Sequence, residues 1–150
     1  MSRLFASSVA IPILIAAIPA VAADFTINVP VTIENMPAAR QFQVYCSTYD
    51  TAEGGGSPVN IVGQGTSARI DIPDGRYSGP PVAIEFNSSE TRGPSEARSY
   101  GCYISIFGVR PDGRSFEAAY FALITSWQAI TGQTVTLSPD GSLVKGAIPR

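Results

Sequence analysis

The sequence contains no histidine, so the commonest acid–base side chain at neutral pH is missing. The chain therefore cannot form a Ser-His or Cys-His nucleophile pair, and most zinc and copper sites lose their preferred ligand. Lysine is almost absent too: Lys145 is the only one, and no S-x-x-K motif precedes it. This composition predicts a protein that is not an enzyme.

Signatures of cofactor and metal binding are also missing. Three consecutive glycines, Gly54–Gly56, have neither the lysine nor the strand-to-helix context of a phosphate-binding loop. Asp71 and Asp74 with Glu85, or Glu53 with Asp50, could supply an acidic pair or a calcium site, but the spacing matches no calcium-binding loop. We expect no cofactor and no bound metal.

Charged residues are scarce and scattered. They make up 15% of the chain, with 10 basic and 12 acidic residues and a formal net charge of −2. Beyond the N-terminus, the basic residues run from Arg40 to Arg150 without forming a cluster. Nucleic acids and anionic membranes are bound through basic patches, so we expect neither as a partner.

The N-terminus has the pattern of an export signal. Arg3 precedes a short apolar run over 9–18, and residues 20–22 form an A-x-A cleavage pattern. We predict a secretory signal peptide over 1–23 and one domain over 24–150; the alternative is an uncleaved anchor. No later stretch approaches membrane length, so we expect an exported protein, periplasmic or secreted, with no membrane span after cleavage.

The only two cysteines lie in separate strand-like segments, 42–49 and 100–109. Each cysteine shares its parity with apolar neighbours, so both are expected to face the core: Phe42, Val44 and Cys46 in the first segment, and Cys102, Ile104 and Ile106 in the second. Exported cysteines usually pair, which predicts a structural Cys46–Cys102 disulfide. A redox role is the weaker interpretation because C-x-x-C is absent.

Alternating segments and turn motifs continue along the mature chain. Apolar residues alternate over 25–33, and Pro30 places that strand at a sheet edge or at a switch between sheets. Short strands are predicted over 59–62 and 68–72, separated by Gly63 and Gly65. Pro-Asp-Gly turns occur three times, at residues 73–75, 111–113 and 139–141. Together these features predict an all-β, antiparallel sandwich of about seven or eight strands with one inter-strand disulfide.

Residues 117–131 have an ambiguous pattern, which fits either a strand or an alanine-rich helix. We favour a strand to about Ile124, followed by a loop or helical turn that carries Trp127. Two other segments, 50–58 and 87–98, are poor in apolar residues and are predicted to be exposed loops.

The stretch before the second cysteine resembles that of immunoglobulin-like domains. An acid stands six residues and a tyrosine two residues before that cysteine in the family, and Glu96 and Tyr100 hold these places before Cys102. Segment 132–137 is similar to a final strand of that class. No tryptophan follows the first cysteine at the usual distance, since the only one is Trp127. The resemblance implies an immunoglobulin-like β-sandwich and leaves the function open.

The chain is also similar to exported pilin subunits, which assemble by donating a strand to a neighbour. The shared features are the size, the single disulfide and the alternating opening strand. In pilins the second cysteine lies nearer to the first, and the C-terminus carries a glycine and a penultimate tyrosine. This chain instead ends at Gly146–Arg150. This resemblance implies a structural subunit as the alternative function.

Four aromatic residues are expected on the outer sheet face, opposite the cysteines: Tyr45, Tyr49, Tyr103 and Phe107. They form a candidate interaction surface. The alternatives are ordinary β-propensity, or cover by the segment around Trp127. We expect a monomeric, non-catalytic binding module for a protein or surface partner. A pilus-like structural subunit is second, and a hydrolase is third.

Overall fold

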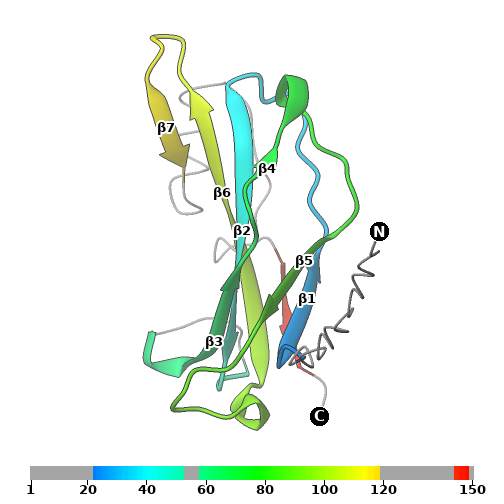
Figure 1. Cartoon of the computed structure of the whole chain (residues 1–150), viewed down its shortest axis with the longest axis vertical. Coiled ribbons are helices and arrows are strands. Elements are labelled where there is room, and N and C mark those ends of the chain that lie inside the picture. The colour runs from blue at the N-terminus through cyan, green and yellow to red at the C-terminus, as the bar shows by residue number, and fades with distance from the viewer. Residues whose placement is uncertain (1–21, 53–57, 119–143, 149–150) are drawn as a thin grey trace, which may run out of the picture.

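Eight β-strands form two antiparallel sheets in the computed structural model, which describes residues 22–52, 58–118 and 144–148 (Figure 1). The strands are β1 (Phe25–Val29), β2 (Ala39–Tyr49), β3 (Ile61–Thr66), β4 (Ile70–Asp71), β5 (Val82–Phe86), β6 (Ser99–Val109), β7 (Ser115–Ala118) and β8 (Val144–Ala147). Short 3₁₀ turns lie at Pro58–Asn60, Pro73–Gly75 and Pro94–Glu96. The predicted all-β class, strand number and antiparallel arrangement are confirmed.

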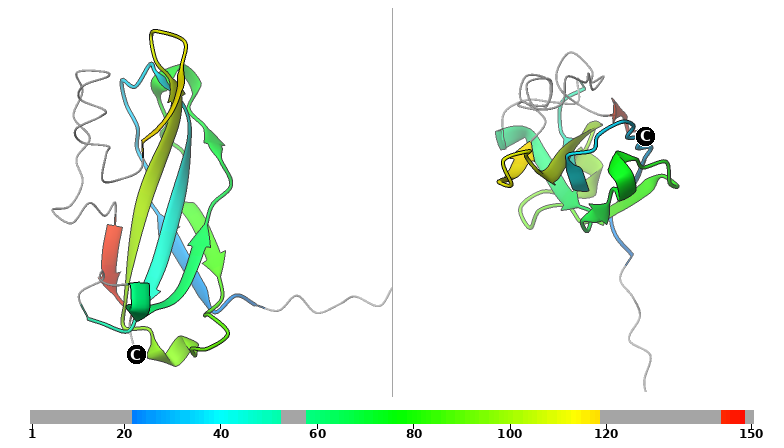
Figure 2. Two further views of the ribbon diagram at one scale, coloured as in Figure 1. Left: turned by 90° about the vertical axis from the view of Figure 1, so that its left-hand side faces the viewer. Right: turned by 90° about the horizontal axis from the view of Figure 1, so that it is seen from above.

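The larger sheet is built around the two longest strands, β2 and β6. They pair antiparallel over nearly their whole length, β3 and β4 pair with β2, and β7 and β8 pair with β6. Figure 2 shows β7 beside one half of β6 and β8 beside the other. The smaller sheet consists of β1 and β5 and covers one face of the larger one. The face of β2 and β6 that the smaller sheet covers is therefore the inner face of the larger sheet.

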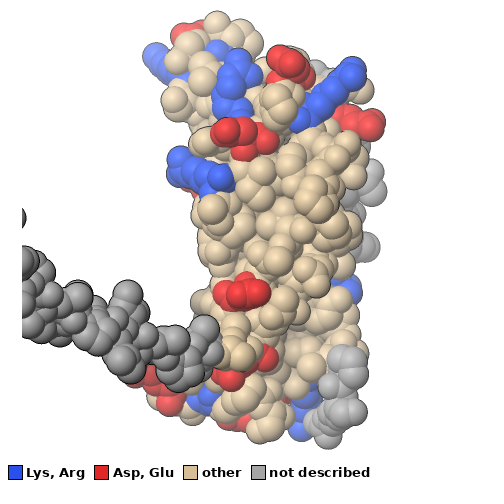
Figure 3. Space-filling view, turned by 45° about the vertical axis from the view of Figure 1, so that its right-hand side comes forward, with Lys and Arg blue, Asp and Glu red and all other residues tan. Residues whose placement is uncertain are grey.

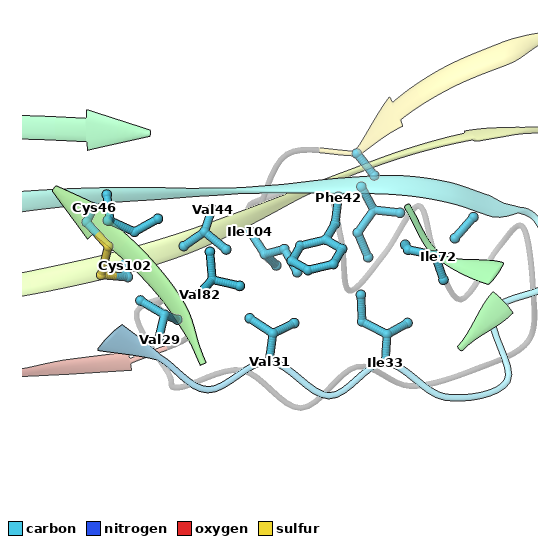
Figure 4. Close-up of a cluster of buried hydrophobic side chains, with 14 of the residues drawn as sticks. Val29, Val31, Ile33, Phe42, Val44, Cys46, Ile72, Val82, Cys102 and Ile104 are labelled. Carbon is cyan, nitrogen blue, oxygen red and sulfur yellow. A yellow bond between two sulfur atoms is a disulfide. The ribbon is translucent and has the colours of Figure 1, made fainter. Parts of the chain in front are cut away.

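The core lies between these two layers, where alternate residues of each strand meet (Figure 4). Its members on β2 and β6 are those that the alternation predicted: Phe42, Val44, Cys46, Cys102, Ile104 and Ile106, all at most 3% exposed. Val29, Val31 and Ile33 reach them from the opposite layer. Each buried aliphatic side chain of this kind stabilises the fold by about 1.5–3 kcal/mol. The core therefore depends on both layers.

The predicted disulfide is present. Cys46 and Cys102 are direct cross-strand partners on β2 and β6, with their Cα atoms 4.1 Å apart. Both are buried, at 1% and 0% exposure. The bond therefore joins the two central strands inside the core.

The opening strand lies at a sheet edge, which is one of the two placements that Pro30 indicated. β1 ends at Val29 and pairs with β5 alone among the described strands. Beyond the proline, Ile33 exchanges two backbone hydrogen bonds with Tyr77, each of 2.8 Å. The apolar alternation over 25–33 therefore continues into the core although regular strand pairing stops at Pro30.

Two of the three Pro-Asp-Gly motifs are confirmed as turns. Asp74 and Gly75 both have positive φ, 52° and 71°. In the second motif Gly113 has φ 82° and donates a 2.9 Å hydrogen bond to the carbonyl of Arg110, joining β6 to β7. The third motif, at 139–141, lies outside the described residues.

Other predictions also fall partly or wholly outside the described residues. β7 confirms a strand only over Ser115–Ala118, so the choice between strand and helix stays open for 119–131. Of the predicted signal peptide, the structure describes only residues 22 and 23, and the cleavage stays a prediction. Within 22–52, 58–118 and 144–148, no helix has the length and apolar character needed to cross a membrane.

The predicted break at Gly63 and Gly65 is wrong, because both glycines lie inside β3. A Cβ on Gly65 would lie only 2.7 Å from Cγ of the Phe86 ring, and one on Gly63 would lie 2.7 Å from the carbonyl oxygen of Asn87. Both neighbours belong to β5 or the residue after it. The glycines therefore let the two sheets approach closely, and they do not interrupt the strand.

Candidate functional site

Charged side chains gather toward the two ends of the molecule on the face shown in Figure 3, and few occupy the middle. One end carries the two loops predicted from the sequence, 50–58 and 87–98. Of the first loop the structure describes only its two flanks, residues 50–52 and Pro58.

Arg92 joins these two loops into one surface. Its Nη2 donates to Asp50 Oδ2 at 2.5 Å and to Glu96 Oε2 at 2.8 Å, and its Nη1 donates to the Val59 carbonyl at 3.2 Å. Asp50 stands at the start of the first loop, and Val59 stands directly after its end. One side chain of the second loop therefore holds both flanks of the first.

Backbone contacts reinforce this arrangement. Asp50 N donates to the Asn60 carbonyl at 3.0 Å, and Arg98 N donates to the Tyr49 carbonyl at 2.7 Å. The Ser99 hydroxyl donates to the carbonyl of Thr51 at 2.5 Å. These bonds fix the base of both loops on β2, β3 and β6. We call the surface formed by Asp50, Val59, Arg92 and Glu96 the Arg92 surface.

The Arg92 surface also includes an exposed apolar side chain. Val59 is 76% exposed, the largest value among the exposed large apolar residues of the described chain. Val59 therefore presents an exposed apolar tip beside the fixed charges of Asp50, Arg92 and Glu96.

Two carboxylates at this end have lowered pKa values. The Gly93 backbone N–H, then the Arg92 guanidinium, holds the pKa of Glu96 below its ordinary value of 4.5. The Ser88 hydroxyl, at 2.7 Å, and then the Ser88 backbone N–H, at 2.9 Å, lower the pKa of Asp24 from 3.8. Since their folded pKa values are depressed, both groups stabilise the fold above pH 4.5, and this stabilisation is lost as the pH falls through the folded values.

We therefore expect the double variant Asp24→Asn, Glu96→Gln to lose less stability on acidification than the wild type. Urea unfolding followed from about pH 7 to about pH 3 measures this difference. The control is Ala83→Ser, a change at an exposed position of β5 that adds and removes no titratable group, which should keep the wild-type dependence of stability on pH. An equally steep acid loss in the double variant would contradict the assignment.

The four predicted aromatics do not form one exposed patch. Tyr45 is 36% exposed and donates its hydroxyl to Gln43 Oε1 at 2.8 Å. Tyr103 is its direct cross-strand partner and is partly buried. Phe107 is also partly buried, and the Arg69 guanidinium lies 3.9 Å from its ring centroid. These three lie on the outer face of the larger sheet, as predicted.

Tyr49 differs from the other three, because only 5% of it is exposed. The alternation of β2 itself is kept at this point, because Thr48 faces Tyr100 and Tyr49 faces Ser99 in regular register on β6. The register shift beside Tyr49 belongs to β3, where Val62 is the extra residue. Tyr49 therefore keeps the parity of the outer face, but its ring is buried there. The expectation of an exposed Tyr49 is therefore wrong, and its ring offers no surface to a partner in this structure.

Of the carboxylates considered for metal or acid–base chemistry, Asp71 and Asp74 have different surroundings. Glu53 lies outside the described residues. Asp71 accepts a 2.9 Å hydrogen bond from Gln41 Nε2, and Asp74 lines a shallow depression of ≈ 530 Å³ with Pro37, Arg40 and Ile72. Within the described residues, no group of three or more acidic or cysteine side chains is placed to hold a metal ion. The charged residues that line this depression are Arg40 and Asp74.

Local sequence patterns did not identify Arg92 as a functional residue. A signal was present, because Arg92 lies between Glu90 and Glu96 in a loop, and opposite charges four residues apart often pair. The partner that makes it important, Asp50, is 42 positions away, and no local pattern reveals it.

Three comparisons with known proteins found no match for this chain. No family model matches the chain, no curated protein matches it, and no solved structure matches it. The function is therefore inferred from the fold and from the Arg92 surface.

Proposed function

We propose that the protein is an exported, non-catalytic binding module of immunoglobulin-like architecture, periplasmic or secreted, that recognises a protein or surface partner through the Arg92 surface. The observation that carries this proposal is the set of hydrogen bonds from Arg92 to Asp50, Glu96 and Val59. Loops held in one geometry by a rigid sheet lose less conformational freedom on binding than free loops do. The buried disulfide supports an oxidising compartment.

A structural subunit is the second candidate. Strand β1 supports it, because an edge strand with one partner among the described strands can offer its other edge to a strand from a second chain. Size-exclusion chromatography with light scattering on the chain from Asp24 separates the two candidates. We expect a monomer; a ladder of oligomers would favour the subunit.

A capture experiment with matched variants tests the binding role. The tagged chain from Asp24, made in an oxidising compartment, is exposed to envelope and culture-fluid fractions of the cells that produce it. We expect Arg92→Met and Val59→Ser each to reduce retention of the captured partner by about tenfold or more, equivalent to about 1.4 kcal/mol. Circular dichroism checks that both variants are folded.

The control is Ala83→Ser, which changes an exposed residue on β5 of the smaller sheet, outside the Arg92 surface. It should retain the partner as the wild type does. Equal retention by all three variants, or no retained partner for the wild type, would overturn the proposal. Turnover of a substrate by the wild type would instead favour the hydrolase.

A further inference from the structure

The loop over residues 87–98 begins with Asn87, Ser88 and Ser89. These three residues have the form N-x-S with a middle residue other than proline, which is the motif at which a glycan is attached to asparagine in secreted proteins. The remaining asparagines lack the motif, because the residue two positions after each of them is Pro30, Pro37 or Val62. The sequence therefore contains one such motif, and its place in the fold decides whether it suits a glycan.

Asn87 lies at the surface, directly after the last residue of β5. Its side chain is exposed, and its Oδ1 accepts a 3.1 Å hydrogen bond from Asp24 N. Within the described residues its Nδ2 donates no hydrogen bond. The amide is thus oriented through its oxygen, while the nitrogen that carries the glycan in such a modification is left for solvent.

The two serines of the motif have different surroundings. The Ser88 hydroxyl donates to the Asp24 carboxylate at 2.7 Å. Ser89 is exposed, and its backbone N–H donates to the Val62 carbonyl at 2.8 Å, but its hydroxyl makes no hydrogen bond in the described part of the chain. The hydroxyl that the motif requires is therefore the one without a structural role.

A glycan on Asn87 is compatible with the contacts that hold this segment. Ser88 forms an antiparallel β-bridge with Gly63, and Ser88 N donates to Asp24 Oδ2 at 2.9 Å. None of the hydrogen bonds around the motif uses Asn87 Nδ2. A glycan is bulky and hydrophilic, so it requires a surface position whose loss to packing costs nothing. The end of β5 provides such a position.

We propose that Asn87 is an N-glycosylation site. In the transfer, Asn87 Nδ2 forms a bond to C1 of the first sugar of a lipid-linked oligosaccharide diphosphate. The bond from C1 to the diphosphate oxygen breaks, the lipid diphosphate leaves with the electron pair, and the nitrogen loses one proton to the transferring enzyme. The site rests on the export that is part of the proposed function, because the motif is used in secreted proteins.

Mass spectrometry of the full chain, isolated from envelope and culture-fluid fractions of the cells that produce it, tests this site. We expect a mass above that of residues 24–150 by one glycan, and fragmentation should place the added mass on Asn87. Asn87→Gln and Ser89→Ala should each lose the added mass completely. Ser89→Thr should keep it, since threonine also satisfies the motif, and so should Ser88→Ala. Circular dichroism checks that the variants are folded.

Each other outcome overturns a defined part of the proposal. An exported chain that has lost residues 1–23 and carries an unmodified Asn87 would overturn the glycosylation site and leave the binding module in place. A chain that keeps residues 1–23 and carries no glycan would overturn the export and the site together. A glycan that persists in Asn87→Gln or in Ser89→Ala would contradict the assignment to this motif.

Discussion

Replacing both Cys46 and Cys102 by alanine is expected to lower the free energy of unfolding by about 4 kcal/mol. The two residues are 56 positions apart, and closing a loop of that size removes about this much entropy from the unfolded chain. A domain of this length has a total stability of about 5–15 kcal/mol, so the bond supplies a large part of it. The expected fall in Tm is roughly 10–20 °C.

Reduction provides the control for this prediction. Wild type unfolded in the presence of dithiothreitol should reach the Tm of the double alanine variant, and the variant should not respond to the reductant. The comparison separates the covalent bond from the packing of the two side chains, which are both buried. The prediction is contradicted if the free energy of unfolding of the double variant lies within about 1 kcal/mol of that of the oxidised wild type. The unfolded chain would then gain little freedom when the bond is absent.

Local patterns predicted the features that depend on neighbours in the sequence. Alternation placed Phe42, Val44 and Cys46 on one face of β2 because successive side chains of any strand point to opposite faces. The same parity paired the two cysteines correctly, since each lay among core residues. Pro30 indicated an edge strand because a proline cannot donate to a ladder, and β1 has one described partner.

Features that depend on distant residues were not visible in the sequence. Gly63 and Gly65 were interpreted as a break because their local effect is to weaken a strand, whereas the residues that require them, Phe86 and Asn87, lie more than 20 positions later. Arg92 is positioned by Asp50 in the same long-range way. Tyr49 keeps the parity of the outer face, since β2 stays in register with β6 there, yet its ring is buried, and burial on that face does not follow from alternation. Such contacts are created by the fold itself.

The opening segment should be indispensable for folding, and alternate residues of it supply a matched test. Changing Val29, Val31 and Ile33 together to serine removes three side chains that are at most 4% exposed. At about 1.5–3 kcal/mol each, the loss is roughly 5–9 kcal/mol, enough to unfold most domains of this size. Changing the exposed Thr26, Asn28 and Thr32 to serine should cost about 0.5 kcal/mol or less at each position. Urea unfolding compares the two triple variants.

Deleting residues 24–34 tests whether this segment acts within its own chain. Strand β5 then loses β1, its only partner strand in the described smaller sheet, and the core loses Val29, Val31 and Ile33. We expect the truncated chain to be unfolded and a synthetic peptide of residues 24–34 to restore its fold, with folding that depends on peptide concentration. A truncated chain that remains a folded monomer would contradict the intramolecular role. If the full chain forms oligomers that disappear on this deletion, the segment joins neighbouring copies instead, and the structural subunit becomes the better account of the protein.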